Sequence, residues 1–186
     1  KKIITLLLIL IPINSYALIE VDITRGNLNP LPVAVSPLSI DEKSRKSFEK
    51  VLKKENIGEE ISSIVENNLR TSGLFNPLSK EAFLQAPDIA NLKPRFEDWN
   101  LIKAQALITG KVNFIDDKLR VEFRLWDVLA AKEMMALAFT TVPSNWRRVG
   151  HIISDKVYER LTGEKGYFDT RIIYVAEEGP KTQRIK

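Results

Sequence analysis

Few residues in this chain could carry out covalent chemistry. Among 186 residues there is one His and no Cys. That composition excludes a disulfide scaffold, a zinc–cysteine or iron–sulfur site, a thiol nucleophile and a polyhistidine metal site. His151 has no acidic or nucleophilic partner in a recognisable arrangement, so we interpret it as a structural or surface residue. The sequence also lacks a Gly-x-Ser-x-Gly elbow, and it therefore predicts a protein that is not an enzyme.

Two short motifs look like ligand sites but lack the residues that such sites need. Thr109-Gly110-Lys111 has no preceding glycine of a Walker motif and falls within an expected strand. We interpret Gly110 as allowing a bulge or the close approach of a helix. Asp116 and Asp117 are adjacent, so as strand residues they would point to opposite faces, and we predict a hairpin turn there rather than a cation site. No cofactor and no metal site is expected.

Three tryptophans and an arginine pair are the remaining candidates for binding. Trp99, Trp126 and Trp146 could form a ligand platform, but we predict that they pack in the core or at its edge. Arg147 and Arg148 begin an expected helix, where the helix dipole disfavours positive charge. The simpler interpretation is a solvated start to the helix, and the mismatch with the dipole favours a carboxylate nearby or an acidic partner.

The overall charge is too small to predict a nucleic-acid-binding protein. The formal net charge is +4, and it falls to +2 if Lys1 and Lys2 are removed with a cleaved leader. Such a small and dispersed excess is unlike the basic patch of a nucleic-acid binder. With 44% hydrophobic and 28% charged residues, the chain has the composition of a folded domain with a core.

Residues 1–17 have the pattern of a Sec signal peptide. Lys1 and Lys2 precede an apolar run over residues 3–13, and a small-x-small exit ends at Ala17. The run is shorter than the roughly 20 residues that cross a bilayer, and the alternatives are a buried strand or a short uncleaved anchor. We expect cleavage between Ala17 and Leu18, a mature protein outside the cytoplasm, and no membrane span after cleavage.

The mature N-terminal segment, residues 18–30, begins with a strand pattern. Apolar and polar side chains alternate, with Ile19, Val21 and Ile23 on one face and Glu20, Asp22 and Thr24 on the other. A turn with Gly and Pro at residues 25–30 ends this strand. Such a segment can add to the sheet edge of a partner through main-chain hydrogen bonds, or it can pair within its own domain. The residues leave both possibilities open.

Periodicity and turn residues predict the elements of the remaining chain. Strands are expected within 31–38 and at 106–115, 119–128 and 133–142, with a short extended piece at 74–78. The main helices are expected at 58–70 and at 145–161, the second capped by Ser144. Residues 41–54 and 79–84 should be helical in part, the former with Phe48, Val51 and Leu52 as its apolar side, and residues 86–94 should form a loop. This order predicts an α/β fold, a mixed β-sheet with two main helices packed on it.

A last expected strand, residues 171–175, comes after a linker at 165–168. A single strand cannot pair with itself, so it either adds to the sheet or begins a second domain.

Several longer motifs resemble the TolB family of the Tol–Pal system in its alphaproteobacterial form. The matching stretches are residues 72–75, 106–110, 123–128, 143–149, 151–153 and 158–172. The resemblance implies an α/β domain similar to the anticodon-binding domains of tRNA synthetases, followed by a six-bladed β-propeller. It also implies a non-enzymatic periplasmic adaptor that links TolA to Pal, for outer-membrane integrity and for envelope constriction during cell division.

The resemblance divides the chain into four parts: a signal peptide (1–17), a partner-binding segment (18–30), the α/β domain (31–168) and the start of a truncated propeller (169–186). In the family, the mature N-terminus binds the C-terminal domain of TolA. The matching positions here are Leu18, Ile19, Glu20, Val21, Asp22, Ile23 and Thr24. In the family, Pal binds the propeller, most of which this sequence lacks. Residues 41–56 are longer and more charged than is usual in the family, and we interpret them as a surface insertion. The alternative from another class is an exported α/β substrate-binding module, which would need a polar cleft.

Overall fold

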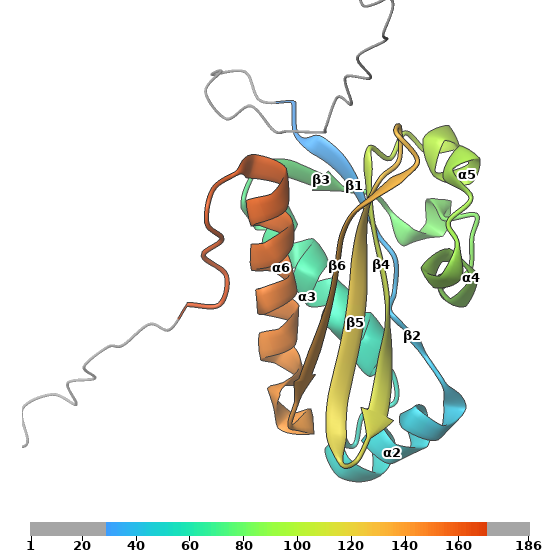
Figure 1. Cartoon of the computed structure of the whole chain (residues 1–186), viewed down its shortest axis with the longest axis vertical. Coiled ribbons are helices and arrows are strands. Elements are labelled where there is room, and N and C mark those ends of the chain that lie inside the picture. The colour runs from blue at the N-terminus through green and yellow to red at the C-terminus, as the bar shows by residue number, and fades with distance from the viewer. Residues whose placement is uncertain (1–28, 171–186) are drawn as a thin grey trace, which may run out of the picture.

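The sheet combines parallel and antiparallel strand pairs (Figure 1). The structure, a computed structural model, describes residues 29–170. β1 (Leu31–Val35) lies between β3 (Phe75–Pro77) and β4 (Ala106–Ile115), and both pairings are parallel; β2 (Ser39–Ile40) also pairs with β4 in parallel. β5 (Lys118–Asp127) and β6 (Lys132–Thr141) continue from β4 as an antiparallel meander. The resulting order, β3-β1-β4-β5-β6, is the mixed sheet that the sequence predicts.

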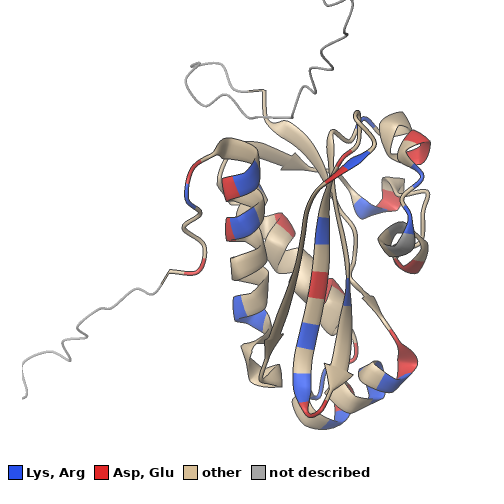
Figure 2. Ribbon diagram, viewed as in Figure 1, with Lys and Arg blue, Asp and Glu red and all other residues tan. Residues whose placement is uncertain are grey.

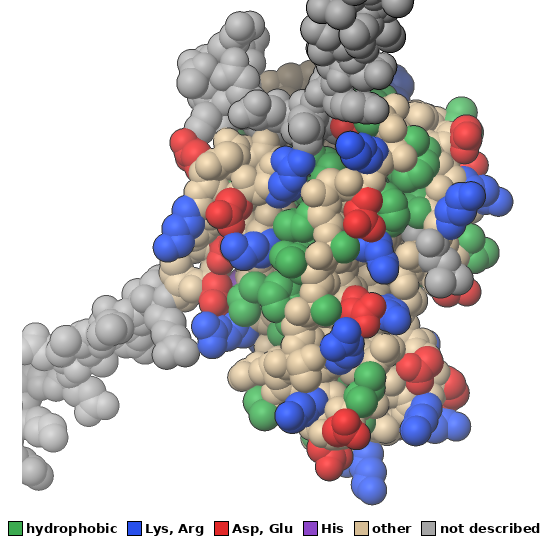
Figure 3. All heavy atoms as spheres, viewed as in Figure 1, with side chains coloured by type: hydrophobic (Ala, Val, Ile, Leu, Met, Phe, Trp, Pro, Cys, Tyr) green, Lys and Arg blue, Asp and Glu red, His purple; other side chains and the backbone are tan. Residues whose placement is uncertain are grey.

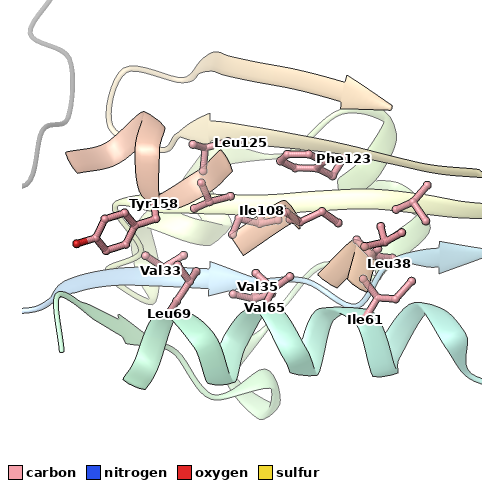
Figure 4. Close-up of a cluster of buried hydrophobic side chains, with 14 of the residues drawn as sticks. Val33, Val35, Leu38, Ile61, Val65, Leu69, Ile108, Phe123, Leu125 and Tyr158 are labelled. Atoms are coloured by element: carbon pink, nitrogen blue, oxygen red, sulfur yellow. The ribbon is translucent and has the colours of Figure 1, made fainter. Parts of the chain in front are cut away.

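Two long helices cover one face of this sheet. α3 (Ile57–Thr71) and α6 (Trp146–Thr162) pack against each other and against the sheet. The apolar positions of α3 meet the inward-facing residues of the strands in one buried cluster that includes Val33, Val35, Ile61, Val65, Leu69, Ile108, Phe123, Leu125 and Tyr158 (Figure 4). Gly150 allows the helices to lie close, because a Cβ there would stand 2.9 Å from the Cγ2 atom of Ile64.

Shorter elements complete the domain. α2 (Glu42–Leu52) and α3 connect β1 to β3, while η2 (Lys80–Ala82), α4 (Pro87–Leu92) and α5 (Phe96–Leu101) connect β3 to β4. These connections provide the crossovers that parallel pairing requires. α4 and α5 lie on the side of the sheet away from α3 and α6. There Trp99 is buried against Ala34, Leu107 and Val128 in a second small core.

Four details of the sequence prediction are wrong. Residues 86–94, expected to be a loop, contain α4, which starts at Pro87, a residue whose fixed φ suits the first helical turn. Ser144 does not cap α6: it lies within η3 (Pro143–Asn145), and Asn145 precedes the helix without a side-chain cap. Val51 is 53% exposed rather than packed with Phe48, because α2 buries only a narrow face.

The fourth detail concerns Gly110. The pairing of Gly110 with β5 has no register shift, which lies instead between Leu125 and Trp126 in the β5–β6 pair, and the nearest neighbours of Gly110 are β5 and Leu38 rather than a helix. A Cβ on Gly110 would stand 2.3 Å from the carbonyl oxygen of Glu122 and 2.9 Å from the Cδ2 atom of Leu38. A glycine is favoured here because the backbone of the neighbouring strand β5 leaves no room for a Cβ.

Three predictions concern residues outside the described part of the chain. They are the signal peptide at residues 1–17, the alternating segment at residues 18–24 and the strand at residues 171–175.

Candidate functional site

His151 lies in a structural hydrogen-bond network between the two main helices. Its Nδ1 atom is 2.9 Å from the Nδ2 atom of Asn68, which also donates to the Oγ atom of Ser154 at 2.9 Å. Ser154 in turn donates to the carbonyl oxygen of Gly150. This network joins α3 to α6 and confirms the structural interpretation of His151.

The three tryptophans pack in separate places and do not form a shared platform. Trp99 donates from Nε1 to the Oε1 atom of buried Gln85 at 3.0 Å, and Trp126 donates to the hydroxyl of Thr109 at 2.9 Å. Trp146 is 6% exposed, with Lys54 5.1 Å and Arg147 4.6 Å from its ring centre. The packing prediction is confirmed, and Lys54, which follows the end of α2, contacts the start of α6 through this ring.

Arg148 has the local carboxylate that its unfavourable helix position indicated. Its guanidinium contacts Asp169 through Nε and Nη2, each at 3.1 Å. These hydrogen bonds raise the pKa of Arg148. The pair is exposed and joins α6 to the chain beyond the helix.

Several carboxylates of the described residues belong to ion pairs or turns. On β5, burial alone would raise the pKa of Glu122, but hydrogen bonds from Arg120 at 3.0 Å and from Lys111 outweigh it, and the pKa is lowered. Figure 2 shows this charged ladder along β5. Asp116 and Asp117 form the predicted hairpin turn, with φ of 50° and 58°. Within residues 29–170 no group of three or more His, Asp or Glu residues is placed to hold a metal ion.

Two hollows in the surface are small for a substrate site. One of about 250 Å³ has Arg45, Glu59 and Asp88 among its lining residues. The other, of about 270 Å³, lies between β6 and α6. Both are smaller than the roughly 300–1,000 Å³ typical of ligand pockets. Neither gives specific support to a substrate-binding module.

The predicted partner-binding residues, Leu18 to Thr24, lie outside the described residues, and the described chain begins a few residues after them. It enters the sheet directly, because the N–H group of Leu31 donates to the carbonyl oxygen of Leu74 at 2.9 Å. β1 has strand partners on both sides. The candidate binding segment is therefore connected to an interior strand by few residues.

Sequence reasoning missed one tightly anchored feature, the strap, which we define as residues 166–169. The Asp155 carboxylate accepts hydrogen bonds from the backbone N–H groups of Phe168 at 2.6 Å and Asp169 at 3.1 Å. A Cβ on Gly166 would stand 2.4 Å from the Cα atom of Asp155. Gly166, in the linker after α6, was a signal that the chain approaches another segment closely here. The sequence did not show that this segment is the one around Asp155.

None of the helices within residues 29–170 combines the length and the apolarity needed to cross a bilayer.

Comparison with known proteins gives consistent results. The family of TolB amino-terminal domains matches residues 19–134. The Tol-Pal system protein TolB of Pelagibacter ubique (strain HTCC1062) is 83% identical over 181 residues, which are 97% of this chain and 41% of that relative. The chain thus spans about two fifths of the length of this relative.

A solved structure shares the fold. The crystal structure of TolB from Acinetobacter baumannii superposes with a TM-score of 0.60 at 24% identity. The match covers 75% of this chain and 30% of the Acinetobacter chain.

Proposed function

The chain belongs to the family of TolB amino-terminal domains, and on that premise we propose that it acts as a non-enzymatic periplasmic adaptor of the Tol–Pal system. The observation that carries the proposal is its 83% identity, over 97% of its length, with a Tol-Pal system protein. Among the described residues, many charged groups are engaged in ion pairs, such as Lys54–Glu60, Arg120–Glu122 and Arg148–Asp169. Adaptor proteins need binding surfaces rather than a reactive centre.

We propose that the mature N-terminus, Leu18 to Thr24, binds the C-terminal domain of TolA. The alternation of Ile19, Val21 and Ile23 with polar residues suits a strand that adds to a partner's sheet edge. The family match begins at residue 19, one residue after Leu18, and so includes Ile19 to Thr24 of this segment. In the sequence this segment is followed closely by the interior strand β1. A pulling force that a partner applies to the segment would therefore act on the core of the domain.

The other part of the adaptor role, the binding of Pal, would belong to the polypeptide that follows the α/β domain. Residues 169–186 are proposed as the start of a β-propeller, through which longer members of the family would bind Pal. A protein that holds TolA at one end and Pal at the other would connect the two membranes, which suits a role in outer-membrane integrity and division.

Titration calorimetry tests the TolA-binding proposal. The mature chain, residues 18–186, is titrated with the TolA C-terminal domain of the same organism, beside a chain that starts at Leu31. Residues 29–170 contain every described helix and strand, so we expect the shorter chain to fold. Binding by the first chain alone supports the proposal. Equal binding by both moves the site onto the α/β domain, and binding by neither overturns the assignment.

A further inference from the structure

All the sulfur of the chain lies in two adjacent side chains. The 186 residues contain two methionines, Met134 and Met135, and no cysteine. Both methionines belong to β6, which lies at one end of the sheet formed by residues 29–170 and pairs with β5. Thiols and thioethers are the usual targets of oxidants in proteins. This sequence offers such groups at a single place, near the start of a strand at the edge of the sheet.

A β-bulge places both methionines against the core. Neighbouring side chains of a regular strand point to opposite faces, yet Met134 and Met135 both pack against the main buried cluster. In the register of the two strands, Met135 lies opposite Leu125. The next pair is Glu133 with Trp126, which leaves Met134 as the extra residue of a bulge. The methionine pair, Met134 and Met135, therefore contacts the core as one unit.

The methionine pair is partly exposed as well as packed. Both side chains are half-buried, whereas the cluster that they pack against is buried. The Nε atom of Arg160 donates to the carbonyl oxygen of Met134 at 3.4 Å, so this part of β6 lies beside the second half of α6. Figure 3 shows hydrophobic side chains gathered in a band at the surface over β6 and the adjoining flank of α6. Such a position leaves thioethers within reach of small solutes.

We propose that the methionine pair is an oxidation site, at which hydrogen peroxide converts the thioethers to sulfoxides in the folded protein. A lone pair of the sulfur attacks one oxygen of the peroxide, the O–O bond breaks, an S–O bond forms, and water leaves after proton transfer. The sulfur loses two electrons and the peroxide gains them. A methionine sulfoxide reductase supplied with a dithiol reverses the change, since the sulfoxide oxygen then leaves as water and the dithiol becomes a disulfide.

Oxidation at this place loosens the junction between β6 and α6. A sulfoxide is polar, whereas the thioethers pack against an apolar cluster that includes Leu125, Val157 and Leu161. The proposed periplasmic location would expose the pair to oxidants outside the reducing cytosol. The chemistry of the site does not depend on the binding of TolA or Pal, so the experiment below can fail while the adaptor proposal stands.

Mass spectrometry of the folded mature chain, residues 18–186, tests the site. After treatment with hydrogen peroxide, the mass should rise by one and then by two oxygen atoms. Both atoms should lie in the tryptic peptide of residues 133–147. Oxidation of the folded chain should be less than about a hundredfold slower than oxidation of the same chain unfolded in urea. Stronger protection of both sulfurs would overturn the proposal, because the reaction would then require unfolding.

Leucine variants separate the two sulfurs and provide the matched control. Leucine and methionine exchange in cores at little cost, so Met134→Leu, Met135→Leu and the double variant should fold. Each single variant should gain one oxygen atom and the double variant none.

Hydrogen exchange measures the loosening. After oxidation, backbone exchange at residues 133–136 and 157–161 should be at least about tenfold faster in the parent chain and unchanged in the double variant. A methionine sulfoxide reductase with dithiothreitol should restore both the mass and the slow exchange of the parent chain. An equal change in the double variant would show that oxidation elsewhere is responsible and would overturn the proposal. Exchange in the parent chain that oxidation leaves unaltered would overturn the loosening of β6 and α6.

Discussion

Asp41 accepts two hydrogen bonds from Ser44, one from the backbone N–H at 2.8 Å and one from the hydroxyl at 2.9 Å. The Ser44 hydroxyl oxygen also accepts from the backbone N–H of Phe114 at 2.8 Å. The N-cap of α2 is thereby joined to β4, with 70 residues of chain separating Ser44 from Phe114. The cap therefore stabilises both a helix end and the contact between α2 and the sheet.

Replacing Asp41 should lower stability at neutral pH. Asp41→Ala is expected to cost about 1 kcal/mol, the usual loss for an N-cap. The hydrogen bond from the Ser44 backbone lowers the pKa of Asp41 below its ordinary 3.8. A lowered folded-state pKa means that this stabilisation is present above the ordinary pKa and is lost as pH falls through the lowered value. Urea unfolding at pH 7 and between about pH 4 and pH 2 measures both effects.

Asp41→Asn is the matched control for this site. Asparagine caps helices about as well as aspartate, so the variant should retain more stability at pH 7 than Asp41→Ala. It should also lose the acid dependence that this carboxylate contributes. An Asp41→Ala variant as stable as the parent chain at pH 7 would contradict the role of the cap.

Gln85 should be essential for the second core, because its side chain accepts the hydrogen bond of the buried Trp99 indole N–H. Its Oε1 atom accepts from the Nε1 atom of Trp99 and from the backbone N–H of Arg95 at 3.1 Å. Gln85→Leu leaves both donors without this acceptor and should cost about 1–3 kcal/mol in urea unfolding. In a double-mutant cycle, the added cost of Gln85→Leu should be smaller when Trp99→Phe has already removed the indole N–H. Strictly additive costs would show that the Gln85–Trp99 hydrogen bond contributes nothing.

Replacement of Gly58 by alanine should lower the stability of the protein, although Gly58 lies in helix α3. Helix propensity alone favours alanine by about 1 kcal/mol. A Cβ at this position, however, would stand 2.1 Å from the carbonyl oxygen of Leu38, which cannot move without shifting the loop before β2. We expect Gly58→Ala to destabilise the chain by about 2 kcal/mol or more in urea unfolding.

Gly73 offers a comparison without a steric neighbour. It has φ of 74°, and a Cβ added there would meet no heavy atom within 4 Å, so Gly73→Ala should cost about 1–2 kcal/mol from backbone strain alone. A stabilising Gly58→Ala would refute the predicted clash with Leu38.

The two faces of the proposed TolA-binding segment should respond differently to substitution. Val21→Asp places a charge on the apolar face and should weaken TolA binding by about tenfold or more in calorimetry. Asp22→Asn changes the polar face with little change in shape and should have a much smaller effect. Equal losses from the two substitutions would argue against a strand that inserts one face into the partner.

Local patterns in the sequence were enough to predict the regular elements. The alternation in residues 119–128 and the turn at Asp116 predict the hairpin of β4 and β5 within a residue or so. The apolar spacing of residues 58–70 likewise predicts α3. These predictions succeeded because burial of one face imposes a period on the sequence, whatever lies on the other side of that face.

Short elements and caps were less predictable. α4 has only six residues and no cap hydrogen bond from a side chain, so its sequence carries little periodicity. The position of Ser144 suggested a cap, but the local chain forms a 3-10 turn that moves the helix start to Trp146. Packing against the rest of the domain, rather than local preference, sets such boundaries.

By itself, the sequence determined the class of fold, the order of its main elements and the family resemblance. Only the tertiary structure decided which distant residues meet: Asn68 with His151, Ser44 with Phe114, and Asp155 with Phe168. It also decided that β6 lies at one end of the sheet formed by residues 29–170. The physical reason is that a hydrophobic period reports that a face is buried, whereas the partner that buries it depends on how the whole chain is connected.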